Sequence, residues 1–501
     1  MSRTETETET ISLQDRRPAD ETGTADDDDD DEVPALPGSE ARQAEASRKR
    51  AMVLLGASIS QLPIWGFAMS YGVFQEYYIS HWTLSGARDV TGVVGTTQNG
   101  VLYLSMPFLF AAFTRRYARH RRLAASLGAV IAAASFVLSS FSTHVWHLVA
   151  TQGVLAALGC ALMFSPTTLS LGEWFSDNGT QRGKRHRAIA YGVTLSCKNV
   201  VGSFMPFVAQ ALLEKFGFRF ALRIWAGVAL VSGVLSIALI PTHPAKVEPE
   251  AEGEGEGEGE ERRRKNIPWH FLRHRTFYIY SVAIVLQSAG YGIPQTYLPS
   301  YAREVTKLSQ TSATLLLTAF NVPGILASTM FGYLSGGENQ GGNGNKRFAK
   351  FRPHLRPATV TAIPPLASAV AAFLLWGLTT RGNLALLLVF SATFGFFAGG
   401  YSATWGGVLS ELEGEAARRN EAVDPGLLYG LLNGARGIGY VTGGLVSVPL
   451  LNAGADASTL VRGGFGISSA YGPLIVFTGL SSVFGGWGLV WKCMSSLRRR
   501  L

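Results

Sequence analysis

Two basic residues occur at matching places in two apolar segments, each at the same distance after a Tyr-Gly pair. Tyr191 to Lys198 reads YGVTLSCK, and Tyr429 to Arg436 reads YGLLNGAR. Seven residues make about two turns of an α-helix, so the tyrosine and the cation share a helix face roughly 10 Å apart. A cation in an apolar environment needs a counter-charge or water. Both residues are therefore candidates for binding an anion.

Neither cation has an acidic partner at the same depth. Lys198 and Arg436 lie about 14 Å from the start of their apolar segments, at ~1.5 Å per helical residue, which is near the centre of a bilayer. No Asp or Glu lies deep in any predicted span. An anionic substrate would neutralise the two charges. Alternatively, the cations bond backbone carbonyls freed in Gly-rich helices and hold two halves of the chain together.

The composition indicates a membrane protein whose helices position these cations. Of the 501 residues, 47% are hydrophobic and 16% are charged, which is not typical of a soluble protein. A helix of about 20 apolar residues crosses the ~30 Å hydrocarbon core of a lipid bilayer. We predict an all-α polytopic fold with twelve transmembrane helices, at 51–76, 92–113, 123–142, 147–172, 188–212, 221–241, 276–300, 311–335, 358–379, 384–409, 427–451 and 471–491.

A polar segment divides these spans into two sets of six. It contains the low-complexity run EGEGEGEGE at 252–260, a composition with too little apolar content to fold. The predicted organisation is a disordered acidic cytoplasmic tail at 1–47, an N-terminal six-helix bundle at 48–241, a cytoplasmic linker at 242–275, a C-terminal six-helix bundle at 276–491 and a basic cytoplasmic tail at 492–501.

Two pairs of motifs relate the two sets of spans. YGVFQEY begins at Tyr71 in the first span and YGIPQTY begins at Tyr291 in the seventh, so Tyr, Gly, Gln and Tyr recur at one spacing. The Tyr-Gly motifs before Lys198 and Arg436 likewise join the fifth span to the eleventh. Motifs that recur six spans apart indicate two pseudo-symmetric bundles.

Basic residues gather on one side of the predicted membrane. The flanks on the side of the termini hold thirty Lys and Arg residues, and the opposite loops hold seven. The positive-inside rule therefore places both termini in the cytoplasm. Because these charges are spread along a membrane face, the net charge of +8 gives no reason to expect nucleic acid as a partner.

Residue patterns typical of enzymes are missing from the span interiors. All nine histidines lie outside them, and the sequence has no HExxH, Cys-His metal spacing or GxSxG motif. His270 and His274 have helical spacing, but they lie in the linker beside basic residues, where we expect a solvated helix face. We expect no catalytic residue, no metal and no cofactor.

The glycines around Arg436 predict close helix packing. Gly430 and Gly434, and then Gly439 and Gly443, each form a GxxxG motif, which lets membrane helices approach one another. No strand precedes them and they do not fit GxGxxG, so we do not expect a dinucleotide-binding loop.

Four longer stretches form a further pattern. They are TQGVLAALGCALMFSP at 151–166, LQSAGYGIPQTYLPSYA at 286–302, GFFAGGYSATWGG at 395–407 and GLLNGARGIGYVTGG at 430–444. Together they resemble the major facilitator superfamily, specifically its fungal monocarboxylate-transporter-like branch. The resemblance covers all twelve spans but neither the acidic tail nor the linker.

The resemblance implies a transporter whose two halves surround a central site that opens alternately to each side of the membrane. Such a transporter works without a cofactor, and we expect it to function as a monomer. In this fold spans one, four, seven and ten line the cavity, while spans two, five, eight and eleven flank it. The substrate-binding residues that we carry over or infer are Lys198, Arg436, Tyr71, Gln75, Tyr291, Gln295, Asn321, Tyr401 and Trp405.

The loop after the second span keeps only part of the gating pattern of this superfamily. The segment FTRRYARHRR at 113–122 lacks the glycine and the aspartate of that pattern but keeps its arginines. We expect Arg115, Arg116 and Arg119 to act in gating. In the second copy of the pattern, GYLSGG at 332–337, Gly336 stands where an acid is expected.

The resemblance also bears on the substrate. Animal relatives couple lactate to protons through a lysine in the first span and an acid-arginine pair in the eighth, whereas this chain has Val73, Phe74 and Asn321 in those regions. We expect a plasma-membrane transporter of an organic anion or carboxylated metabolite. Export of a fungal secondary metabolite is one alternative, and a non-transporting substrate sensor is another. The sequence leaves uptake and export open.

Overall fold

The computed structural model describes residues 39–114, 117–175, 181–241, 270–335, 357–421, 423–460 and 465–498. The chain divides into the units Met1–Ala46 and Ser47–Leu501, and the fold given below is that of the second. The α-helices are α1 (Ser39–Ile59), α2 (Gln61–Ser80), α3 (Thr91–Thr114), α4 (Arg121–Ser139), α5 (Val145–Leu148), α6 (Ala156–Trp174), α7 (Gln181–Leu239), α9 (Arg275–Glu304), α10 (Gln310–Ser335), α12 (Pro357–Val370), α13 (Leu384–Gly400), α14 (Trp405–Ala417), α15 (Pro425–Leu460), α16 (Gly472–Gly485) and α17 (Trp487–Arg498).

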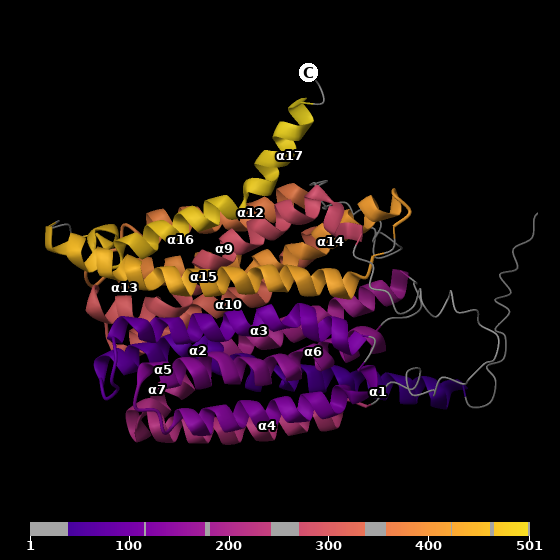
Figure 1. The fold of residues 1–501 in the computed structure, drawn as a ribbon, viewed down its shortest axis with the longest axis horizontal. Coiled ribbons are helices and arrows are strands. Elements are labelled where there is room, and N and C mark those ends of the chain that lie inside the picture. The colour runs from indigo at the N-terminus through magenta and orange to yellow at the C-terminus, as the bar shows by residue number, and fades with distance from the viewer. Residues whose placement is uncertain are drawn as a thin grey trace, which may run out of the picture. The chain divides into compact units, whose positions relative to one another are not determined.

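The all-α prediction is confirmed. Across the described ranges, the only β pairing is an isolated bridge between Ser85 and His144. In Figure 1 the helices from α2 to α7 lie on one side of the bundle and those from α9 to α16 lie on the other. Each side contains the helices of six predicted spans, and we refer to the two sides as the first and the second half.

Within the described residues, ten helical stretches are long and apolar enough to cross a membrane, against the twelve spans that the sequence predicts. One difference is α3, whose first residues, TGVVGTTQNG, lower its hydropathy. The other is the stretch Ile189–Leu239, which counts once although its 51 residues cover two predicted spans. At 1.5 Å per residue it is roughly 76 Å long, more than twice the ~30 Å bilayer core.

A break at Gly217 divides α7 into two membrane helices. Gly217 has φ 74° and ψ 168°, a left-handed conformation that glycine adopts without the steric cost of a side chain. The break falls between the predicted spans 188–212 and 221–241, where the sequence predicts a connection. The sequence and the structure therefore agree on where the fifth and the sixth span are separated.

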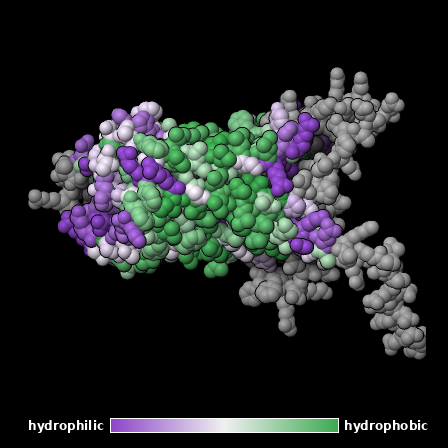
Figure 2. All heavy atoms as spheres, turned by 90° about the horizontal axis from the view of Figure 1, so that it is seen from below, coloured by the Kyte–Doolittle hydropathy of each residue, from purple (hydrophilic) through white to green (hydrophobic). Residues whose placement is uncertain are grey.

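The surface of the helices matches a lipid environment. Figure 2 shows a broad apolar band across the helical part of the molecule, with hydrophilic residues at both of its ends. Large apolar side chains are exposed in the middle of helices, including Phe108 at 75%, Val231 at 68% and Leu326 at 71%. Exposed apolar area on this scale is costly in water and is favourable against lipid tails.

The two halves meet along two main helix pairs. α3 packs against α15, and the first part of α7 packs against α10, which pairs the second predicted span with the eleventh and the fifth with the eighth. These are the flanking pairs that the resemblance implied. α2 also packs against α9.

Small residues on α15 make this packing close, which confirms the prediction from the GxxxG motifs. A Cβ added at Gly434 would lie 2.7 Å from Cγ of Pro107 in α3. A Cβ at Gly439 would collide with the carbonyl oxygen of Val285 in α9. Opposite faces of α15 therefore rest on a helix of each half.

Candidate functional site

Arg436 lies on α15 and is enclosed by aromatic rings. Its side chain is buried, with 6% of the residue exposed. The guanidinium carbon lies 4.9 Å from the ring centre of Tyr103, 5.4 Å from Tyr291, 5.9 Å from Trp405 and 5.7 Å from Tyr440. Each distance is within the range of a cation-π interaction, which stabilises a positive charge without neutralising it.

Glycine next to Arg436 explains why a ring of the other half reaches the guanidinium. A Cβ at Gly437 would lie 2.5 Å from the backbone nitrogen of Leu104 in α3. Because no side chain separates the helices at this level, the preceding residue of α3, Tyr103, approaches Arg436 directly.

Lys198 lies on the first part of α7 and stacks on Trp65 of α2. Its Nζ atom is 4.1 Å from the Trp65 ring centre. The Trp65 ring centre lies 5.4 Å from that of Tyr103, which contacts Arg436, so the two cations border the same group of rings. The structure therefore brings together the two cations that the sequence analysis paired.

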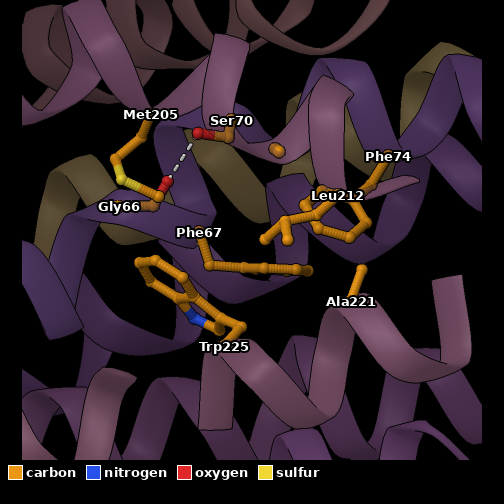
Figure 3. Close-up of a pocket in the computed structure, with 9 residues that line it drawn as sticks. Gly66, Phe67, Ser70, Phe74, Met205, Leu212, Ala221 and Trp225 are labelled. Carbon is orange, nitrogen blue, oxygen red and sulfur yellow. Dashed lines mark hydrogen bonds between the residues drawn. The ribbon is translucent and has the colours of Figure 1, made fainter. Parts of the chain in front are cut away.

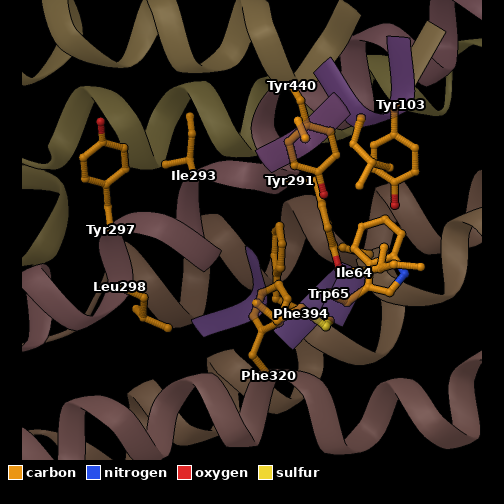
Figure 4. Close-up of a cluster of buried hydrophobic side chains, with 14 of the residues drawn as sticks. Ile64, Trp65, Tyr103, Tyr291, Ile293, Tyr297, Leu298, Phe320, Phe394 and Tyr440 are labelled. Atoms are coloured by element: carbon orange, nitrogen blue, oxygen red, sulfur yellow. The ribbon is translucent and has the colours of Figure 1, made fainter. Parts of the chain in front are cut away.

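The rings around the two cations come from both halves. Trp65 and Tyr103 belong to α2 and α3, whereas Tyr291, Trp405 and Tyr440 belong to α9, α14 and α15. Figure 4 shows Trp65, Tyr103, Tyr291 and Tyr440 gathered in one part of a buried cluster, and Tyr297 in another. We call Trp65, Tyr103, Tyr291, Trp405 and Tyr440, with the two cations, the central site.

No carboxylate of the described residues forms an ion pair with either cation of the central site. Two cations near one another and apart from any counter-charge raise the free energy of the protein in an apolar interior. Cation-π contacts offset only part of that cost. The arrangement is suited to receive an anion.

Three predicted substrate-binding residues lie in the C-terminal halves of α2 and α9. The Tyr71 hydroxyl donates to the carbonyl of Thr91. The Ser300 hydroxyl donates to the side-chain carbonyl of Gln75, which links the two halves. Gln295 is buried at the same junction, where its backbone oxygen lies close to Gly72.

An ion pair and a buried tyrosine complete this junction. Arg303 Nε lies 3.6 Å from Oε1 of Glu76, whose side chain is 7% exposed. Tyr297 of α9 lies against Gly92 of α3, and its hydroxyl is 2.8 Å from Ser447 Oγ of α15. We call the contacts of Gln75, Glu76, Tyr297, Ser300 and Arg303 the closed end.

Asn321 bridges α10 and α7, and its two side-chain hydrogen bonds go to backbone carbonyls and not to the cations. Its Nδ2 donates to the carbonyl of Gly202 at 3.0 Å and to that of Leu317 at 2.8 Å. The side chain is 2% exposed. Its donors serve the packing between the halves.

Tyr401 and Trp405 lie where the tenth predicted span is interrupted. The 3₁₀ segment Tyr401–Thr404 joins α13 to α14, and its tighter winding redirects the side chains on either side. Both residues are buried, with ring centres 6.3 Å apart. Trp405 contacts Arg436, and Tyr401 extends the same aromatic group.

The structure tests little of the predicted gating loop. Arg115 and Arg116 lie outside the described residues, and Arg119 is exposed. The neighbouring Arg121 is instead buried, donating from Nε to the carbonyl of Phe113 at 2.8 Å and from Nη1 to Glu173 at 2.7 Å. This pair fixes the ends of α3, α4 and α6 within the first half.

The prediction of a solvated histidine face is wrong for His274. This residue is fully buried, with Nε2 2.7 Å from a Glu421 oxygen and Nδ1 3.3 Å from a Glu415 oxygen. The helical spacing of His270 and His274 and their basic neighbours favoured exposure to solvent. In the structure, the end of α14 and the loop after it cover the start of α9. In the described part of the chain, no group of three metal-ligating side chains was found.

The first half contains a small pocket. It lies between α2 and α7 and is lined by Phe67, Phe74, Met205 and Trp225, among others (Figure 3). Ser70 lines it too, but its hydroxyl donates to the carbonyl of Gly66 at 2.7 Å. None of the lining residues is charged, so the pocket offers an anion no counter-charge.

The sequence analysis missed three residues of the central site. Tyr440 follows Arg436 by one helical turn, so its position on the same face was readable from spacing. Tyr103 follows from the pairing of the second span with the eleventh. Trp65 carries no signal in the sequence that separates it from a packing residue.

Membrane-length helices in two halves, with two cations between them, are typical of a membrane transporter. The comparison with known families is specific on this point. A family model of the Major Facilitator Superfamily matches residues 53–444, and the chain belongs to this superfamily. It is therefore a multi-pass membrane transporter and not an enzyme.

Relatives of this chain are transporters of fungi and animals. The MFS-type transporter pynF of Aspergillus niger is 24% identical over 409 residues, 82% of this chain and 83% of the relative. Monocarboxylate transporter 12 of Homo sapiens is 26% identical over 379 residues, 72% and 64% of the two chains. Aspyridones efflux protein apdF of Emericella nidulans is 25% identical over 350 residues, 70% and 62% of the two chains. These relatives confirm the resemblance to monocarboxylate transporters.

Proposed function

We propose that this transporter moves an organic anion or carboxylated metabolite, and that the anion binds at Arg436 and Lys198. The observation that carries the proposal is the burial of Arg436 among four rings, with no carboxylate partner among the described residues. A charge at this depth needs a counter-charge. A substrate carboxylate supplies one and fits the guanidinium with two hydrogen bonds.

Transport by alternating access is supported by the difference between the central site and the closed end. The closed end joins α2 to α9 through paired polar groups. The charge bias favours cytoplasmic termini, and the closed end would then face the outside. On this proposal, a monomer in the plasma membrane rocks its bundles, 48–241 and 276–491, about the α3–α15 and α7–α10 pairs.

Export of a metabolite is the second candidate function. It is favoured by the similarity to apdF, which is named as an efflux protein. Export and uptake use the same central site, so the direction changes none of the residues proposed here. Substrate movement in both directions across the membrane separates the two.

The test is the transport of labelled carboxylates by the purified protein in liposomes. Replacing a buried charge that meets its partner costs about 2 kcal/mol or more, so Arg436→Gln should slow transport roughly thirtyfold or more. The matched control is Arg223→Gln. Arg223 also lies in a predicted span, 5.0 Å from the Phe141 ring centre, and it donates to Ser140 Oγ at 3.1 Å.

The transport rate of the control should lie within about twofold of that of the unchanged protein, because Arg223 is exposed and the contacts of exposed charges contribute little. Unchanged transport by the folded Arg436→Gln protein would reduce Arg436 to a packing residue. An equal loss in both variants would contradict a special role of the central site.

A further inference from the structure

A series of neighbouring aromatic rings connects the two cations. Lys198 stacks on Trp65, and the ring centres of Trp65 and Tyr103 are 5.4 Å apart. Tyr103 in turn faces Arg436 and lies 5.7 Å from Tyr440, with ring planes 20° apart. A ligand that bridges both cations must therefore lie along ring faces.

Donors without partners gather around this surface. The atoms are Arg436 Nε, Trp65 Nε1, Trp405 Nε1 and the Tyr401 hydroxyl, none of which has a hydrogen-bond partner among the described residues. All four residues are more than nine-tenths buried. Buried donors are nearly always satisfied in folded proteins, so a group of them beside two cations indicates a missing acceptor. The set supplies mainly donors, and a matching ligand supplies oxygen acceptors.

The near-parallel pair of Tyr103 and Tyr440 crosses the boundary between the halves. Tyr103 is on α3 and Tyr440 is on α15. A flat ligand stacks on ring faces of this kind, whereas a branched aliphatic ligand does not.

We infer that the substrate is a flat, conjugated anion with oxygen acceptors beyond its charged group. Its charge lies between Arg436 and Lys198, its plane lies against Trp65 and Tyr103, and its further oxygens accept from the indole and hydroxyl donors. This inference rests on the proposed anion site and adds the shape and the acceptor pattern of the substrate.

Three labelled bicyclic carboxylates of equal charge test the inference. Coumarin-3-carboxylate is flat and carries ring oxygens, 2-naphthoate is flat without them, and decahydro-2-naphthoate is saturated. Uptake of each into liposomes that hold the full-length protein is measured. Stacking should favour 2-naphthoate over its saturated analogue by roughly three- to tenfold, and coumarin-3-carboxylate should be taken up faster still.

Variants of two tryptophans show where the preference arises. Trp65→Leu should bring the uptake ratio of 2-naphthoate to its saturated analogue close to one, and Trp65→Phe should restore part of it. The control is Trp225→Leu. Trp225 is also buried with an unpartnered indole nitrogen, but it lines the small pocket of the first half. A ratio within one variant does not depend on how much of it folds.

Each outcome decides between the two proposals. Equal uptake of the flat and the saturated probe, abolished by Arg436→Gln, overturns the inference and keeps the anion site. The inference is also overturned, and the anion site kept, if none of the three probes enters the liposomes while another carboxylate does. If no anion moves and Arg436→Gln changes nothing, both proposals are wrong.

Discussion

The central site and the closed end differ in how their polar groups are satisfied. At the closed end Glu76 pairs with Arg303, and Gln75 accepts from Ser300. At the central site Arg436 is surrounded by aromatic rings, and its Nε atom has no acceptor in the described residues. Polar groups that satisfy each other across the halves hold a conformation, whereas groups left without partners are available to a ligand. On the proposed function, this difference separates a gate from a binding site.

The closed end should open when its ion pair is removed. Glu76→Gln keeps the shape of the side chain but removes the attraction to Arg303, which is 41% exposed. An ion pair of this exposure contributes up to about 1 kcal/mol, so opening should become up to roughly fivefold more frequent. The measurement is the labelling rate of a cysteine at Thr296, a buried residue of this junction, by a membrane-impermeant maleimide.

The matched control is Glu173→Gln, which removes the partner of Arg121 within the first half. It should leave the labelling of the cysteine at Thr296 unchanged. If Glu76→Gln does not accelerate labelling, or if both variants accelerate it equally, the closed end is not held by this ion pair.

A smaller effect is expected at Asn321, which lies at neither of the two regions. Asn321→Leu removes the hydrogen bond from α10 to Gly202, and interhelical bonds of this kind contribute about 0.6 kcal/mol on average. Thermal unfolding should begin slightly earlier, while the relative uptake of different anions stays the same. A changed order of substrates would return Asn321 to the binding site that the sequence analysis assigned to it.

Most of the fold could be predicted from the sequence because membrane helices are specified locally. Apolar length alone places the spans, and the charge of the loops gives an orientation. The break at Gly217 was placed correctly because a short polar stretch separates two apolar runs. The hydropathy of α3 is lower for a reason that the structure explains, since its polar first turns are buried against other helices and are not exposed to lipid.

The residues of the central site were predicted less completely because the site depends on contacts between distant helices. Lys198 and Arg436 were found because an intramembrane charge is rare and costly. Trp65 and Tyr103 became part of the site only through packing of α2 and α3 against helices of distant sequence position. His274 was misjudged because its carboxylate partners come from the far end of α14 and the loop after it.

The most direct test of the account compares an acid with its neutral amide. Binding of 2-naphthoate and 2-naphthamide to the purified protein is measured, and again to Arg436→Gln. The unchanged protein should prefer the acid by about tenfold or more, as a buried charge pair worth at least ~1.4 kcal/mol requires, and the variant should lose most of that preference. Equal binding of acid and amide to the unchanged protein would contradict the claim that the central site holds an anion.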